Sequence, residues 1–91
     1  MILPAGLKRI EEYAFTDCSA ASVCLPEGLE SIGAYAFSDC WKLKRINIPD
    51  SVTEIDENAF RYCWNLTIYG SANSLAQSYA EAHNFDFKEL K

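Results

Sequence analysis

Cysteine is the residue type here with the clearest capacity for chemistry, and it recurs at a regular interval. Cys18, Cys40 and Cys63 each end an Ala-Phe-x-x-Cys motif and lie 22 and 23 residues apart. Zinc sites and redox sites normally use closely paired cysteines such as C-x2-C, and the sequence has no such pair. Three interpretations remain: buried thiols that act as small apolar side chains, a disulfide, or a metal site.

Other catalytic chemistry finds little support in the sequence. His83 is the single histidine, and a catalytic histidine needs a nucleophile and an orienting acid beside it. The sequence contains no G-x-S-x-G, no H-E-x-x-H and no glycine-rich phosphate loop. We therefore predict a chain that is not an enzyme, with no cofactor and no bound metal, and with His83 complementing a helix C-terminus.

Two tryptophans and one strand offer the candidate interaction residues. Trp41 and Trp64 each follow a motif cysteine, and we expect them to stack on one another. Exposed aromatic pairs can anchor a protein or sugar partner. Alternatively, the two indoles cover the turn above the core. Arg45 and Asn47 occupy the outward positions of a predicted strand and complete the candidate surface.

The composition narrows the class of protein. The chain has 91 residues, a net charge of −5 and 49% hydrophobic residues, which fits one ordinary globular domain. The acidic balance argues against nucleic-acid binding and against docking on anionic membranes. No run of about 18 apolar residues predicts a membrane span, and the N-terminus does not resemble a signal peptide.

Internal repetition dominates the sequence. The segments "LPAGLKRIEEYAFTDC" (3–18) and "LPEGLESIGAYAFSDC" (25–40) agree at ten of sixteen positions, and "IPDSVTEIDENAFRYC" (48–63) keeps the apolar frame. The prolines and phenylalanines of the three copies also step by 22 and then 23 residues. A period of 20–29 residues with Leu and Ile at fixed offsets is the leucine-rich-repeat size class.

Each repeat predicts two short extended segments and a corner. The segment 44–49 alternates apolar and polar residues, which is typical of a strand with one buried face. The segment 51–55 predicts a second extended piece, and 57–60 predicts a compact turn or short helix. The linker of the first repeat is one residue shorter, which should place Ala21 where later repeats have Leu43 and Leu66 and weaken the packing there.

The segment after Gly70 lacks the repeat frame. Ser71 or Ser74 could cap a helix, and Ser74 with Gln77 fits a capping box. We predict a helix over about 72–83, with Leu75, Tyr79 and Ala82 on its buried stripe, and then a short strand over 85–87. These elements would form a cap on the last coil.

Together these observations predict an α/β leucine-rich-repeat solenoid. Its right-handed coils would contain short strands and a short helical turn, followed by a C-terminal helical cap. The domain would span 1–91, with repeats over about 3–24, 25–47 and 48–69 and a cap over 70–91. No comparable cap precedes the first repeat, so we expect a fragment of a longer array that can self-associate through this open edge.

The predicted solenoid favours one of the three interpretations of the motif cysteines. Stacked coils hold parallel side chains with Cβ atoms farther apart than the ~3.8 Å that a disulfide prefers. We therefore favour buried thiols at the three motif positions. Cys24 replaces Asn47 between two inward residues, so it should face outward and could link two copies.

The unit L-P-x-x-L-x-x-I-x-x-x-A-F-x-x-C-x-x-L-x-x-I-x-I-P resembles the BspA-like leucine-rich repeats, also called type 5, over residues 3–69. The resemblance implies a non-enzymatic surface protein, and adhesion to host or matrix proteins is the role attached to some members. Trp41 and Trp64 depart from the family pattern, where a small polar residue is usual. We accordingly predict a protein-interaction module of a cell-surface or secreted parent, and the alternative is an architectural spacer without a ligand.

Overall fold

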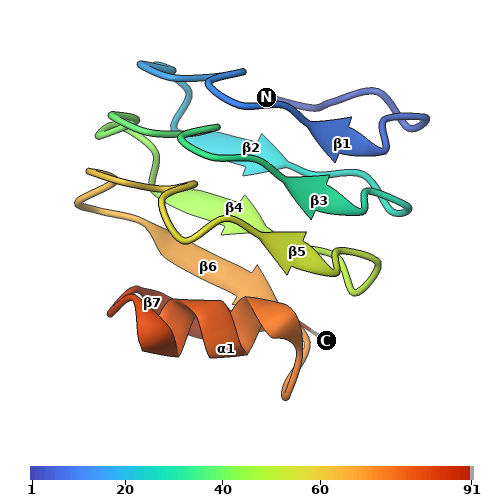
Figure 1. Ribbon diagram of the computed structural model, residues 1–91. Coiled ribbons are helices and arrows are strands. Elements are labelled where there is room, and N and C mark those ends of the chain that lie inside the picture. Colours follow the sequence, from blue (N-terminus) through green and yellow to red (C-terminus); the bar gives the residue numbers. More distant parts are fainter. Residues whose placement is uncertain (91) are drawn as a thin grey trace.

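A computed structural model describes residues 1–90 and shows a solenoid of stacked coils (Figure 1). Its elements in chain order are β1 (Arg9–Ile10), β2 (Ser22–Cys24), β3 (Ser31–Ile32), β4 (Arg45–Asn47), β5 (Glu54–Ile55), β6 (Thr67–Gly70), α1 (Leu75–Ala82) and β7 (Asp86–Glu89). Each coil contributes one strand to each of two parallel sheets, and these have the orders β1-β3-β5 and β2-β4-β6-β7. The predicted α/β leucine-rich-repeat solenoid with a C-terminal cap is therefore confirmed.

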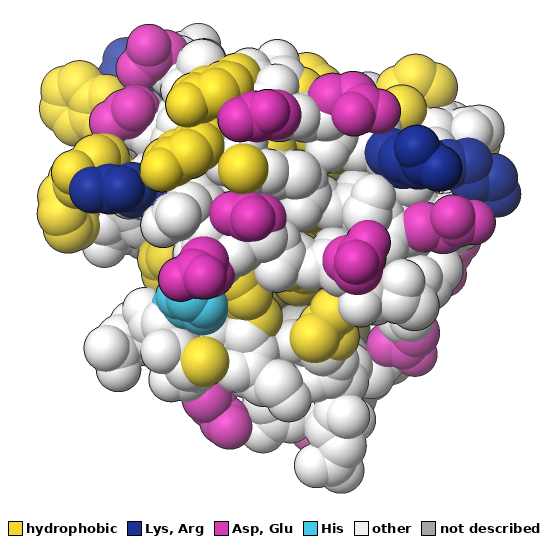
Figure 2. Space-filling model, viewed as in Figure 1, with side chains coloured by type: hydrophobic (Ala, Val, Ile, Leu, Met, Phe, Trp, Pro, Cys, Tyr) yellow, Lys and Arg dark blue, Asp and Glu magenta, His cyan; other side chains and the backbone are white. Residues whose placement is uncertain are grey.

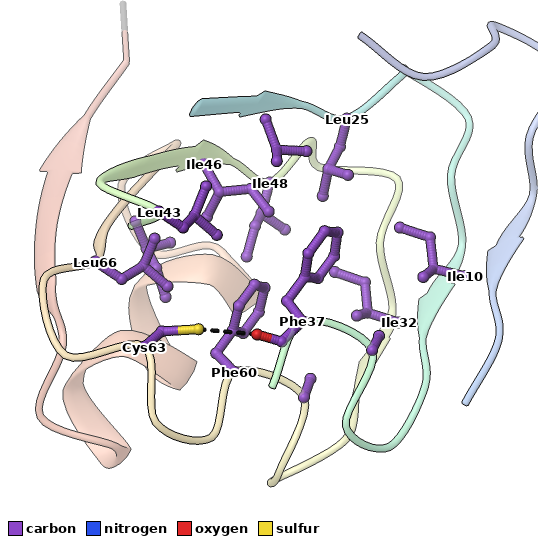
Figure 3. Packing of buried hydrophobic residues seen from close by; sticks show 14 of the residues in the cluster. Ile10, Leu25, Ile32, Phe37, Leu43, Ile46, Ile48, Phe60, Cys63 and Leu66 are labelled. Atoms are coloured by element: carbon purple, nitrogen blue, oxygen red, sulfur yellow. Dashed lines mark hydrogen bonds between the residues drawn. The ribbon is translucent and has the colours of Figure 1, made fainter. Parts of the chain in front are cut away.

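Residues from every coil meet in one continuous core between the two sheets (Figure 3). Ile10 and Ile32 pair in register on one sheet, and Ile46 pairs with Ile68 on the other. These isoleucines face inward because alternate residues of a strand point to opposite sides. A single coil cannot bury such a face, and stacking therefore supplies most of its burial.

The Ala-Phe-x-x-Cys motif forms the corner between the two sheets. The corners, residues 12–17, 34–39 and 57–62, consist of six consecutive turn residues rather than a helix. Their backbones also bond from coil to coil: the Phe37 N–H donates to Ala59 O at 2.8 Å, as Phe15 N–H does to Ala36 O. The phenyl rings of Phe15, Phe37 and Phe60 stack with centroids 5.3 and 5.4 Å apart.

The extra residue of the second coil lies between Cys40 and Arg45. The corner phenylalanines step by 22 and then 23 residues, whereas Ser22 pairs with Arg45, a step of 23, and Arg45 with Thr67, a step of 22. This offset corrects the expected position of Ala21, which is exposed, while Ala20 packs against the core. The first coil is indeed less buried, because Phe15 and Cys18 are only partly covered.

Helix α1 begins and ends where its capping residues dictate. The Ser74 hydroxyl accepts from Gln77 N–H, and the Gln77 side chain accepts from Asn73 N–H at 2.7 Å. At the other end Asn84 adopts φ 63° and Phe85 N–H donates to Ala80 O, the arrangement of a Schellman motif. The helix buries Ala76, Tyr79 and Ala80, whereas Leu75 and Ala82, predicted on the buried stripe, are exposed.

The cap closes the last coil on two sides. Strand β7 pairs in parallel with β6, and it extends the larger sheet by one strand. Tyr79 of α1 packs edge-on against Phe60 and donates its hydroxyl to Glu57 O at 3.2 Å. Within residues 1–90, no helix has both the length and the apolar character that crossing a bilayer requires.

Candidate interaction surface

The tryptophans lie on the outer edge of the solenoid, just after the corners. Trp41 is 64% exposed and Trp64 is 74% exposed. In Figure 2 hydrophobic side chains protrude along the left edge, where Figure 1 places the corners. Neither indole therefore contributes a buried surface comparable to that of the core phenylalanines.

The expected stacking of Trp41 on Trp64 is wrong. Among the described residues the ring partner of Trp64 is Tyr62, with centroids 5.5 Å apart and planes tilted by 47°. Asn65 donates its side-chain amide to Trp41 O at 3.4 Å, a contact to the backbone and not to the indole. Direct stacking of corner rings is found instead at Tyr13 and Tyr35, whose centroids are 5.1 Å apart.

Arg45 and Asn47 lie on the outward face of β4, as predicted. Arg45 is exposed, but Asn47 is half-buried and its amide is engaged with the previous coil. The Asn47 Oδ1 accepts from Leu25 N–H at 3.0 Å, and its Nδ2 donates to Leu25 O at 3.3 Å. The side chain thus continues the ladder of hydrogen bonds beyond the end of β2, which leaves Arg45 as the freer contact residue.

A shallow depression of about 540 Å³ covers this outward sheet face. Its floor includes Cys24, Arg45, Asn47 and Tyr69, and neither tryptophan lines it. The four residues predicted from the sequence consequently occupy two separate places, the sheet face and the corner edge.

The cysteines divide as predicted into buried and outward thiols. Cys40 and Cys63 are buried, Cys18 is partly buried, Cys24 is exposed, and all four are free. Cys63 Sγ donates to Phe37 O at 3.0 Å (Figure 3), and Cys40 Sγ donates to Phe15 O at 3.2 Å. The neighbouring Cys63 thiol, together with burial, raises the pKa of the Cys40 thiol far above its ordinary value.

This pattern explains why cysteine recurs at the corner. Each thiol is small enough to fit the core, and those of Cys40 and Cys63 donate to a carbonyl of the coil before them. A neutral, buried thiol is a poor nucleophile and a poor metal ligand. No cluster of three metal-ligating side chains is found in the part of the chain that the structure describes.

His83 is the C-cap residue of α1, so its predicted position at a helix C-terminus is correct. Its ring stacks on Tyr79 with centroids 4.2 Å apart. His83 also lines a larger groove, of about 630 Å³, between the third corner and the cap. Across this groove stand Tyr62 and Trp64.

The groove and most of its lining were missed by the sequence prediction. Tyr62 carried a usable signal, because it replaces the aspartate found at Asp17 and Asp39 in the other corners. Asn84 and Asp86 carried none, since their approach to the third corner depends on how α1 folds back. Their placement was therefore not predictable from the repeat pattern.

Comparison with known proteins agrees with this architecture. The model of the "BspA type Leucine rich repeat region" matches residues 1–90 with six copies of its unit. The structure of a leucine-rich cell surface protein from Faecalibacterium prausnitzii is similar, with 25% identity and a TM-score of 0.54. That likeness covers 100% of this chain and 32% of the other, so this chain spans about a third of its length. No curated protein sequence matches the chain.

Proposed function

This chain belongs to the BspA-type leucine-rich-repeat family, and on that basis we propose that it is a non-enzymatic protein-interaction module of a cell-surface protein. The family and the surface-protein likeness support a repeat module that mediates protein interactions. We further propose adhesion to a host or matrix protein as its use. The observation that carries this proposal is the set of exposed aromatic side chains at and just after the corners.

The edge has the chemistry that protein interfaces favour. Besides the two tryptophans, Tyr13 is 54% exposed and Tyr62 is 43% exposed. Large aromatic side chains are over-represented among residues that dominate binding energy, because they bury much area with little loss of rotamer freedom. Such rings gathered at one edge of a small domain are a better contact surface than scattered single residues.

A second contact is proposed at Arg45 on the outward sheet face. Arg45 is exposed in the depression that Cys24 and Tyr69 also line, and this face is the surface that stacked repeats usually present to partners. Arg45 would add a directional hydrogen bond or ion pair to the aromatic contacts.

The test is capture of the chain by matrix deposited by cultured epithelial cells. We expect wild type to be retained, and Trp41→Ser with Trp64→Ser to lose most of that retention while unfolding at the same denaturant concentration. Glu27→Ser, at an exposed site away from the corners, is the matched control and should behave as wild type. Loss of stability in the double variant, or no retention of wild type, would instead favour an architectural spacer.

A further inference from the structure

The groove between the third corner and the cap has its own chemistry. Both of its sides combine aromatic and polar side chains: Tyr62 and Trp64 lie beside Arg61 on the corner side, and Phe85 lies between Asn84 and Asp86 on the cap side. We propose that this groove binds a neutral β-linked oligosaccharide. The inference goes beyond the proposed protein interaction and concerns a site that Trp41 does not line.

The repeat itself shows which residues of the third corner are not needed for the fold. The buried positions keep their residues, since Ala59, Phe60 and Cys63 match the earlier copies. Two other positions change from small or acidic residues to large ones: Arg61 replaces the exposed Thr16 and the buried Ser38, and Tyr62 replaces Asp17 and Asp39. Both changed side chains line the groove.

Tyr62 adopts a conformation that is unfavourable for an aromatic residue. Its φ is 66°, where Asp17 and Asp39 have 59°, and aspartate tolerates this left-handed region better than a bulky residue does. Tyr13 and Tyr35 also have positive φ, of 61° and 58°, in the two earlier corners, so a left-handed tyrosine does not by itself mark a site. What distinguishes the third corner is that an aromatic ring stands where the other two corners have aspartate.

Arg61 holds the Tyr62 ring in place, whereas the Trp64 indole stays mostly exposed. The Arg61 guanidinium lies 4.9 Å from the Tyr62 ring centroid and donates to the Tyr62 hydroxyl at 3.1 Å. One face of the tyrosine is thus covered by a cation. The Trp64 indole, tilted by 47° against that ring and 74% exposed, offers the open stacking surface.

The opposite wall supplies polar atoms from the cap. The left-handed Asn84 ends α1 and directs the chain into β7. Asn84 and Asp86 of the cap, and Glu57 at the start of the third corner, are exposed to solvent at the groove, so their carboxylate and amide groups can accept from and donate to hydroxyls. Figure 2 shows the histidine, in cyan, next to acidic side chains on this part of the surface.

These features select a neutral sugar over a charged ligand. The groove contains the carboxylates of Glu57 and Asp86 and the guanidinium of Arg61, so charges of opposite sign partly offset one another and the lining does not strongly attract an ion of either sign. Neutral hydroxyls can bond to all three groups. In a β-linked hexose the axial C–H bonds form a flat apolar face that suits stacking on an indole. A volume of about 630 Å³ lies within the range of small-molecule sites.

The test is titration of the purified chain with cellotetraose and with lactose, followed by tryptophan fluorescence and calorimetry. We expect saturable binding of at least one sugar. Trp64→Ala should weaken it by more than about tenfold, while Trp41→Ala should change it by less than about twofold. Tyr62→Asp, which restores the residue of the other corners, should also weaken binding and keep the native circular-dichroism spectrum.

Two results would overturn the inference. One is no binding of either sugar at about 20 mM, far above the concentrations at which specific sites saturate. The other is an equal loss of the sugar-induced fluorescence change in Trp41→Ala and Trp64→Ala, which would indicate non-specific indole quenching. Matrix capture by a chain that binds neither sugar would remove the oligosaccharide site and leave the proposed protein interaction standing.

Discussion

Each corner, taken with the cysteine and the residue that follow it, has an inner side and an outer side with sharply different surroundings. On the inner side Phe37, Ala36 and Cys40 are fully buried, and the Phe37 ring lies between those of Phe15 and Phe60. On the outer side Trp41 is 64% exposed and has no stacked tryptophan among the described residues. The same short stretch, "AYAFSDCW" (34–41), therefore contains both fully buried and mostly exposed side chains.

This difference shows at which positions a departure from the repeat is informative about function. An inner residue packs against copies of itself, so a change in one coil disturbs the coils on both sides. An outer residue contacts solvent and can differ from coil to coil. Departure from the repeat at an outer position, as at Tyr62, thus points to a role outside the fold.

The largest predicted effect is on the inner phenylalanine ladder. Phe37→Ala should lower the free energy of unfolding by about 3–5 kcal/mol, because it leaves a cavity between two stacked rings. Phe15→Ala should cost clearly less, since Phe15 is partly exposed and stacks on one side only. Urea unfolding measures both, and equal losses would contradict a graded ladder.

The next effect concerns the thiol that donates to the core. Cys63→Ala removes the donor to Phe37 O and should cost about 1–3 kcal/mol. Cys24→Ala, at an exposed thiol, should stay within about 0.5 kcal/mol. Labelling of native protein with a thiol reagent should modify Cys24 first. Fast modification of Cys40 would show that its thiol is not shielded by the core.

Alkaline pH should separate a buried phenol from an outer one. Burial raises the pKa of Tyr79 above its ordinary value of 10.0. The folded state therefore keeps the Tyr79 proton at pH values where the unfolded state has released it. The contribution of Tyr79 to the free energy of unfolding is complete below about pH 10 and is lost as the pH rises further. The slope should approach about 1.4 kcal/mol per pH unit.

Tyr79→Phe should flatten this alkaline loss in urea titrations at pH 9–12, and it should slightly lower stability at neutral pH because the bond to Glu57 O disappears. Tyr13→Phe, at an exposed ring, is the matched control. An unchanged alkaline slope in Tyr79→Phe would show that another group causes it.

The smallest effect is expected on the outer edge. Trp41→Ser and Trp64→Ser should each change the free energy of unfolding by less than about 0.5 kcal/mol, because both indoles are mostly in water. A loss above about 1.5 kcal/mol at either position would mean that the indole covers the turn after all, and the contrast between inner and outer halves would not hold.

Sequence patterns predicted the inner half well. Period, strand alternation and the Ser74 cap are local or repeated signals, and each depends on residues close together in the chain or on copies of one unit. The outer half was predicted less well. Leu75 was placed on the buried stripe of α1, but the helix turns Ala76 toward Gly70, where only small residues fit.

The sequence by itself determined that this chain is a stacked-coil repeat protein, because a 22–23-residue apolar frame can bury its face in no other way than against its own copies. The tertiary structure alone decided that Trp41 and Trp64 are not equivalent. The cap folds back beside only the last corner, so Trp64 lines the groove between that corner and the cap, whereas Trp41 does not.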